Sequence, residues 1–149
     1  MRDAPAFLYA DDPDAPGWHR WELNEVDRFN AVIGPLAVRV EEGVARVRMT
    51  PDRRHSNLAD HMHGGAMLAF IDMALFAAGR SFGVLEAVRA VTLDLATQFI
   101  APPALGAPVE ARIELLRETG RLLFLRGLVV QGETNVASFT GTLRKASAA

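Results

Sequence analysis

The sequence predicts one α+β domain in which an antiparallel sheet wraps around a single long helix. The first observation behind this prediction is the stretch from Gly65 to Ala78, which is apolar on almost every side. A helix of that kind is normally buried. The second observation is that the segments on both sides of this stretch alternate between apolar and polar residues, with short turns between them, as in hairpin-connected strands. A chain of 149 residues is long enough to bury the core that such a domain needs.

Composition excludes several classes of protein. The formal net charge is −2, so the chain as a whole offers no surface for a polyanion, which argues against a nucleic-acid-binding protein. There is no cysteine, hence neither a disulfide framework nor thiol catalysis. The apolar helix is too short to cross a bilayer. The first ten residues show no signal peptide, and we expect a cytoplasmic protein without membrane partners.

The first 33 residues are expected to form an N-terminal arm that ends in a short helix. Residues 1–17 contain several prolines and aspartates, which predicts an extended segment. Residues 22–32 are predicted to be helical, with Trp18 and Trp21 packing the start of that helix against the domain.

Two strands and a polar loop are predicted before the long helix. From Gly34 the apolar period is two, with Leu36, Val38 and Val40 on one face, and residues 44–50 are expected to return as the second strand. Residues 52–62 form the polar loop, and Gly79 and Gly83 close the helix region.

Four strands are predicted after the helix, over residues 88–100, 109–117, 122–130 and 136–144. In the first of these, Val91, Leu93, Leu95 and Phe99 are expected on one face. The domain should therefore span residues 34–145, and residues 146–149 are expected to fray.

The apolar helix contains one acid, Asp72, and begins at the flexible sequence His63-Gly64-Gly65. An ionised carboxylate in a core is costly unless it is paired or used. The start of a helix offers unpaired N–H groups and the positive end of the helix dipole. Asp72 lies eight residues after Gly64, about 12 Å along the helix axis at 1.5 Å per residue. The two groups can meet at one ligand only if a second copy lays its helix antiparallel beside the first, which predicts a symmetric dimer with two composite sites.

The pattern Asn57-x5-His63-Gly64-Gly65-x6-Asp72 resembles the hotdog-fold thioesterases of the PaaI-like group. The similarity covers residues 34–144, and it includes the following further matches: Thr92-Leu93-Asp94-Leu95, Phe99, Pro102 to Gly106, Gly120-Arg121-Leu122 and Gly141-Thr142. There are two departures. Asp60 stands where many relatives have glycine, and the N-terminal arm is not part of the common pattern.

This resemblance implies roles for individual residues. The backbone N–H of Gly64 would polarise a thioester carbonyl, and Asp72 would act as base or nucleophile. Asn57 and Thr92 would orient the attacking water, and His63 belongs to the same motif. Arg121 would lie near the phosphates of coenzyme A. Further substrate contacts are expected from these residues: Gly65, Met67, Leu68, Ile71, Phe99, Gly120 and Arg53.

Each role has a structural alternative. Asp72 could form a salt bridge inside an interface, and His63 could hold the loop through backbone hydrogen bonds. Asn57 could be a turn former, the commonest use of that residue. Thr92 could be an ordinary strand residue. Arg121 could be a solvated charge at the tip of a hairpin.

Three functions follow from these observations. The first is an acyl-CoA thioesterase for medium-chain or aromatic acyl groups, acting as a homodimer or a dimer of dimers. The second is a non-catalytic acyl-CoA or fatty-acid binding protein, and the third is an enoyl-CoA hydratase of the same fold. No cofactor is expected, since coenzyme A would be part of the substrate. His55, His61 and His63 lie near Asp60 in one loop without cysteine, and we expect no metal there.

Overall fold

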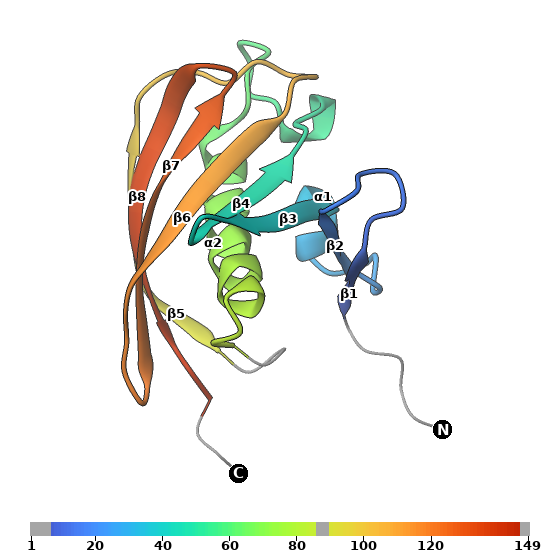
Figure 1. Ribbon diagram of the computed structural model, residues 1–149. Helices are drawn as coiled ribbons and strands as arrows, with labels where there is room; N and C mark the ends of the chain where they lie inside the picture. The colour runs from blue at the N-terminus through green and yellow to red at the C-terminus, as the bar shows by residue number, and fades with distance from the viewer. Residues whose placement is uncertain (1–6, 86–89, 147–149) are drawn as a thin grey trace.

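The computed structural model describes residues 7–85 and 90–146. Its strands form one antiparallel sheet in the order β1-β2-β3-β4-β6-β7-β8-β5. Their bounds are as follows: β1 Phe7–Asp11, β2 His19–Leu23, β3 Leu36–Glu41, β4 Val44–Met49, β5 Val91–Phe99, β6 Val109–Glu118, β7 Leu122–Gln131 and β8 Thr134–Arg144. Figure 1 shows the sheet curving around the long helix α2 (Gly64–Ser81), with β5 at one edge and the β1–β2 hairpin at the other.

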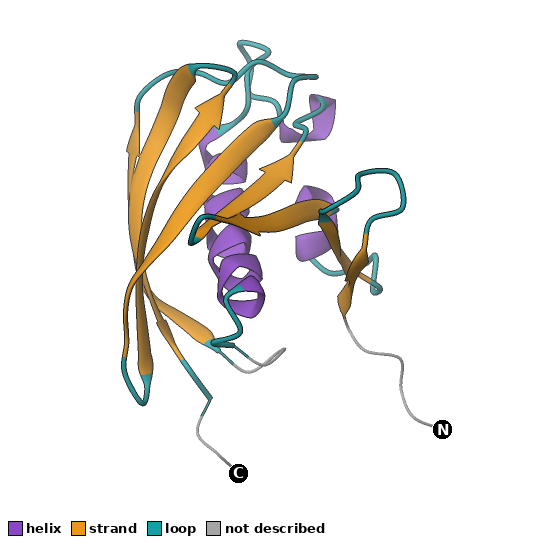
Figure 2. Ribbon diagram, in the orientation of Figure 1, coloured by secondary structure: helices purple, strands orange, loops and turns teal. Residues whose placement is uncertain are grey.

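The core lies between α2 and the concave face of the sheet. Phe70, Ile71 and Leu75 of the helix are completely buried, as are Val47 and Ile113 of the sheet. Figure 2 shows α2 as the long helix, whereas the other helical segments, α1 (Asn30–Ile33) and η1 (Arg53–His55), are short. The predicted class, an antiparallel sheet around one buried helix, is confirmed. Among the described residues, no helix combines the length and apolar character needed to span a membrane.

The N-terminal arm differs from the prediction. The helix predicted over residues 22–32 is wrong for most of that range, because helical structure is confined to α1. The segment before it forms a hairpin whose strand β2 pairs with β3, placing Trp21 opposite Leu36. A sheet edge carries a row of unpaired backbone groups, and pairing with them outweighs a weak local preference for helix. The predicted extended segment thus contains β1, and its residues 1–6 lie outside the described residues.

The hairpin is attached to the domain at two places. Tyr9 packs against the core, its hydroxyl lies 3.4 Å from Ser81 Oγ, and the guanidinium of Arg80 lies 5.5 Å from its ring. Trp18 is buried beside the guanidinium of Arg48, 4.0 Å from the centre of the indole. The N-terminal hairpin therefore extends the sheet and also contacts the last turn of α2.

Glu110 organises the sheet next to Trp18. Its buried carboxylate accepts hydrogen bonds from Arg48 Nε at 2.7 Å, Arg112 Nε at 2.8 Å and Arg46 Nε at 3.1 Å. Burial alone would raise the pKa of Glu110, but the hydrogen bonds from Arg112, Arg46 and Arg48 outweigh it and lower the pKa to about 2. The carboxylate therefore remains ionised in the folded protein at all but very acidic pH.

The predicted apolar face of one strand needs correction. In β3, Val40 shares a face with Leu36 and Val38 as predicted, because it pairs with the buried Ala45, although its own side chain is 41% exposed. In β5 the pairing register shifts between Thr92 and Asp94, which marks a β-bulge. A bulge adds one residue, so the side chains beyond it change face. Leu93 is accordingly 53% exposed, and Val91 is exposed too, whereas Leu95 packs against the core.

The remaining predicted elements agree with the structure to within a few residues. Two of the predicted segments lie partly outside the residues that the structure describes. The strand predicted from residue 88 is described only from Val91, since residues 86–89 are not described. The tail predicted over residues 146–149 is described only at its first residue.

Candidate active site

His63 caps the N-terminus of α2. This residue is the N-cap, and its Nδ1 accepts a hydrogen bond from the N–H of Gly65 at 2.8 Å. Its own N–H donates to the carbonyl of His55 at 2.7 Å. The N–H of Gly64, by contrast, donates to none of the residues that the structure describes. The first N–H of the helix is therefore available to a ligand. His63 itself holds the loop through backbone hydrogen bonds, which is the structural role considered for it above.

The loop before the helix is shaped by Asn57 and Asp60. Asn57 Oδ1 accepts hydrogen bonds from the N–H groups of Ala59 at 2.9 Å and His61 at 3.1 Å. Asn57 thus makes the hydrogen bonds of a turn-forming residue, the structural role considered for it above. Asp60 has a φ of +59°, the left-handed conformation that glycine adopts without strain and that aspartate tolerates better than most residues. The loop therefore keeps a glycine-type conformation although Asp60 departs from the common pattern.

His55 fixes this loop through hydrogen bonds at both of its ring nitrogens. Its Nδ1 accepts from the N–H of Asp52 at 2.9 Å, so Nε2 carries the proton and donates to the carbonyl of Val32 at 2.5 Å. Both ring nitrogens are used in backbone contacts. Across residues 7–85 and 90–146, no three His, Asp or Glu side chains are grouped in a way that could hold a metal ion.

Asp72 is paired with Thr92. The hydroxyl of Thr92 donates to Asp72 Oδ1 at 2.5 Å, and both residues are half-buried. The bulge in β5 explains why Thr92 reaches the helix, because it turns Thr92 rather than Leu93 towards it. A threonine hydroxyl that donates to one oxygen fixes the orientation of the carboxylate and leaves the second oxygen for another partner.

An apolar pocket of about 310 Å³ lies beside the start of α2. It is lined by the predicted catalytic residue Gly64 and by two predicted substrate contacts, Met67 and Phe99. A Cβ placed on Gly64 would lie 3.6 Å from ring atoms of Phe99, so this ring covers the Cα of Gly64. The other lining residues were not predicted: Met62, Ile100, Ala101, Pro102, Pro103 and Val136. The signal that could have found them was the proline pair Pro102-Pro103 shortly after Phe99, because the carbonyl of Pro103 accepts a hydrogen bond from the N–H of Met62, just before the helix start, at 2.9 Å.

Comparison with known proteins identifies the family. The model of the thioesterase superfamily matches residues 59–138, which include the helix start, Asp72 and Thr92. The chain belongs to the thioesterase superfamily.

Solved structures place this chain in the PaaI-like group with the hotdog fold. A mutant of the phenylacetic acid degradation protein PaaI from Thermus thermophilus is 31% identical, with a TM-score of 0.66, over 80% of this chain and 100% of that one. A conserved protein from Pseudomonas aeruginosa is 28% identical, with a TM-score of 0.68, over 80% and 94% of the two chains. A hypothetical thioesterase from Streptococcus pneumoniae, solved with coenzyme A, is 18% identical with a TM-score of 0.65 over 74% and 84%, and shows the fold alone. No curated protein matches the chain.

Other predicted site residues lie apart from the pocket. Ile71 is completely buried in the core, whereas Leu68 is 37% exposed and lies one turn before Asp72. Gly120 and Arg121 form the β6–β7 hairpin, at the opposite end of α2 from Gly64 (Figure 1). Arg53 lies in η1, and its side chain is exposed. Within one chain, therefore, Asp72 and Arg121 are not next to Gly64.

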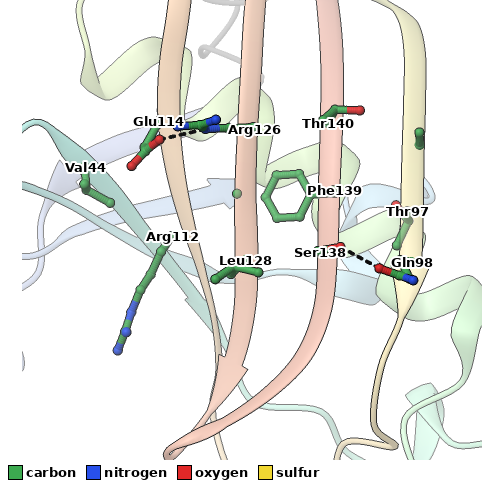
Figure 3. A pocket seen from close by; sticks show the side chains of 12 residues that line it. Val44, Thr97, Gln98, Arg112, Glu114, Arg126, Leu128, Ser138, Phe139 and Thr140 are labelled. Atoms are coloured by element: carbon green, nitrogen blue, oxygen red, sulfur yellow. Dashed lines mark hydrogen bonds and ion pairs between the residues drawn. The ribbon is translucent and has the colours of Figure 1, made fainter.

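A larger hollow, of about 760 Å³, lies over β5 to β8 (Figure 3). Arg126 pairs with Glu114 across it at 2.9 Å, and Ser138 Oγ lies 3.4 Å from Gln98 Oε1. Exposed residues such as Leu128 line it, whereas their neighbour Val129 is buried in the core. This hollow thus opens on the convex face of the sheet, away from Asp72, and nothing in the sequence indicated it.

Proposed function

We propose that the protein hydrolyses the thioester of a medium-chain or aromatic acyl-CoA to the free acid and coenzyme A. The observation that carries this proposal is that α2 contains both Asp72, whose carboxylate accepts a hydrogen bond from Thr92, and Gly64, whose N–H donates to none of the described residues. Membership of the thioesterase superfamily supports the reaction type. The apolar pocket beside Gly64 supports the class of acyl group.

The reaction follows from the chemistry of these groups. The carbonyl oxygen of the thioester would accept a hydrogen bond from Gly64 N–H, where the helix dipole stabilises the negative charge that develops on attack. Asp72, held by Thr92, would remove a proton from an attacking water that Asn57 orients. Alternatively, Asp72 would attack the carbonyl carbon itself and form an anhydride, which water then hydrolyses to the free acid and the restored carboxylate. In either case the C–S bond breaks, and the sulfur leaves as the thiol once it has taken up a proton.

The site would be shared between two copies of the chain. Gly64 and Asp72 are about 12 Å apart along one helix, too far to act on the same carbonyl. If two copies of α2 lie antiparallel with Asp72 of one facing Gly64 of the other, the residue midway between them faces its own counterpart. That residue is Leu68, which is partly exposed on the same side of α2 as Asp72. The isologous arrangement of a two-fold dimer then forms two equal sites.

The pocket would select the acyl group. All nine of its lining residues are apolar or glycine, so a charged acyl group would lose hydration without gaining a partner. Met67 and Phe99 would contact the chain or ring, and methionine adapts readily to different shapes. Gly65 allows the thioester to approach the backbone closely. At the other end of the substrate, Arg121 beside Gly120 and the exposed Arg53 would contact the phosphates of coenzyme A.

Replacement of Asp72 tests this function. In the Asp72→Asn variant the side chain keeps its shape but can neither accept a proton nor attack, so we expect thiol release to fall by a factor of about 10² to 10⁴. The measurement is free-thiol release from short, medium, long and arylacetyl CoA esters. The matched control is Asp94→Asn, an exposed acid on the same strand as Thr92, which should retain wild-type activity. An Asp72→Ala protein with nearly wild-type turnover would rule out the mechanism.

A further inference from the structure

A row of paired residues crosses the convex face of the sheet from β2 to β6. Ala37 of β3 pairs with Arg20 of β2 on one side and with Arg48 of β4 on the other, and Arg48 pairs in turn with Glu110 of β6. Cross-strand partners point to the same face, and successive residues of a strand point to opposite faces. Since Val47, next to Arg48, is completely buried in the core, the row faces away from α2. The small side chain of Ala37 thus lies between two arginines.

A cavity of about 400 Å³ lies beside Ala37, and we call it the arginine cavity. It is larger than the pocket of about 310 Å³ beside Gly64, so it has room for an acyl group of the same size. β2 and β3 lie towards the opposite edge of the sheet from β5, which separates this cavity from the proposed active site (Figure 1). Its lining includes charged and apolar residues: Arg20, Arg48, Arg54, Asp12, Asp52 and Pro35. Sites for small molecules combine an apolar wall with a few polar groups in this way.

The unused hydrogen-bonding groups of the arginine cavity are donors. Arg48 donates through Nε to Glu110 at 2.7 Å. Arg20 comes no closer to a carboxylate than 3.7 Å, the distance from its Nε to Asp12 Oδ1. Among the described residues, neither guanidinium donates through its terminal N–H groups. An arginine side chain has five N–H donors, so a ligand beside Ala37 can accept hydrogen bonds from both sides.

The two acids of the lining already have donors. Asp52 accepts hydrogen bonds from the N–H of Arg54 at 2.9 Å and from its Nη2 at 3.1 Å. Asp12 accepts from the N–H of Asp14 at 3.0 Å. Three arginines and two aspartates in the lining leave an excess of one positive charge. The cavity therefore favours an anion over a cation.

We propose that the arginine cavity binds a carboxylic acid with an apolar body. The carboxylate lies over Ala37 and accepts hydrogen bonds from Arg20 and Arg48, and the planar guanidinium group suits a carboxylate because it can donate twice. The apolar body packs against Pro35 and Met49. The proposed thioester hydrolysis releases an acid of this class, but the binding site depends on its lining alone.

Tryptophan fluorescence provides the test, because it reports on this part of the molecule. The chain has two tryptophans, Trp18 and Trp21, which lie next to and within β2. The guanidinium of Arg48 lies 4.0 Å from the centre of the Trp18 indole, so a carboxylate that binds Arg48 changes the surroundings of this ring. The pocket beside Gly64 contains neither tryptophan.

The titration compares octanoate with octanol, its uncharged analogue, and with inorganic phosphate, an anion without an apolar body. We expect a saturable change in fluorescence with octanoate alone. Arg20→Gln removes one side of the carboxylate site, and Ala37→Leu fills the space between the arginines. Each should weaken octanoate binding at least about tenfold. The matched control is Arg28→Gln, an exposed arginine paired with Glu25 outside the cavity, which should bind octanoate as the wild type does.

Three results would overturn the inference. The first is the absence of a saturable change when octanoate is added to the wild type. The second is an affinity for octanoate that Arg20→Gln leaves unchanged, a result that does not depend on whether Ala37→Leu folds. The third is binding of octanol or phosphate as tight as that of octanoate, which would show that charge and apolar body are not recognised together.

Thiol release separates this inference from the proposed function. Arg20 and Ala37 are not part of the proposed active site, so their variants should release thiol from octanoyl-CoA at the wild-type rate. A protein that hydrolyses no thioester but binds octanoate through Arg20 would refute the proposed function and support the arginine cavity. The Asp72→Asn variant should keep the fluorescence change with octanoate. Loss of that change would place the acid at the active site and overturn the inference.

Discussion

At the scale of single residues, the proposed chemistry depends on how Asp72 is held. Its carboxylate is half-buried on a helix that is otherwise apolar, and the Thr92 hydroxyl is its hydrogen-bond donor at 2.5 Å. A hydrogen bond to a charged group contributes more than one between neutral groups. Thr92 thus acts on the reaction through Asp72, as a positioning residue.

Removal of the Thr92 hydroxyl should lower turnover. A hydrogen bond to a charged group contributes about 1.5–3 kcal/mol, so Thr92→Ala is expected to reduce kcat by about ten- to a hundredfold. Thr92→Ser restores the hydroxyl and should recover most of the activity. The measurement is kcat for thiol release at saturating acyl-CoA.

The same strand provides a matched control for this prediction. Thr97 Oγ1 is buried and has no hydrogen-bond partner among the described residues. Thr97→Val removes a hydroxyl that makes no such contact, so activity should remain at the wild-type level and stability should not fall. Equal losses of activity in Thr92→Ala and Thr97→Val would contradict a specific role for the Asp72 contact.

At the scale of elements, the N-terminal hairpin and the sheet are joined around Glu110. This carboxylate lies between Arg46 and Arg48 of β4 and its own neighbour Arg112 on β6, and Arg48 in turn stacks on Trp18. Removing one partner from a buried ion cluster leaves the other charges without compensation. The cluster therefore couples the hairpin loop to the central strands.

Glu110 gives the protein a defined pH dependence of stability. Its pKa in the folded state, about 2, lies below the ordinary value of 4.5. The ionised carboxylate thus stabilises the fold above about pH 4.5, and this contribution is lost as the pH falls towards 2. At neutral pH the contribution is on the order of 3 kcal/mol, at 1.36 kcal/mol per unit of pKa.

Glu110→Gln tests this contribution. The difference in unfolding free energy between wild type and variant should be largest at neutral pH and shrink between pH 4.5 and 2, as measured by denaturant titrations at a series of pH values. Glu114→Gln breaks only an exposed pair with Arg126 and should cost less than about 1 kcal/mol. A difference for Glu110→Gln that does not change with pH would show that the effect is steric rather than ionic.

At the scale of the whole molecule, one chain contains the parts of the proposed site but does not bring them together. Asp72 and Gly64 lie two turns apart on α2, and Arg121 lies at the far end of the sheet (Figure 1). Leu68, Leu93 and Phe99 remain partly exposed around the helix and its edge strand. Burial of these side chains against a second copy would complete two sites at once.

The antiparallel dimer predicts that Leu68 of one copy lies next to Leu68 of the other. The chain has no cysteine, so Leu68→Cys introduces a single thiol. Under mild oxidation we expect this variant to form a covalent dimer, detected by non-reducing electrophoresis, because its Cα atoms would lie within the roughly 4.4–6.8 Å that a disulfide spans. Val26→Cys, at an exposed loop position, is the control and should stay largely uncrosslinked. Equal crosslinking of both variants would contradict the proposed axis.

Local chemistry was enough to predict most elements and the residues of the motif. The apolar run over α2, the alternation in β6 to β8 and the residues at the helix start depend on near neighbours in the chain, so the sequence shows them directly. The N-terminal segment was misassigned because its conformation is set by pairing with β3, a contact between distant residues. The face of Leu93 was misassigned because one extra residue in β5 reverses the side-chain alternation, and a period-two pattern contains no sign of it.

The sequence by itself determined the family, the α+β class and the candidate groups Gly64 and Asp72, because these follow from residue type and spacing. Only the tertiary structure decided that Thr92 is the partner of Asp72, that Asn57 and His63 bind their own loop, and that Phe99 covers Gly64. The physical reason is that hydrogen bonds and side-chain contacts depend on directions and distances set by the packing of α2 against the sheet. Residues far apart in the chain obtain those directions only when the whole domain is folded.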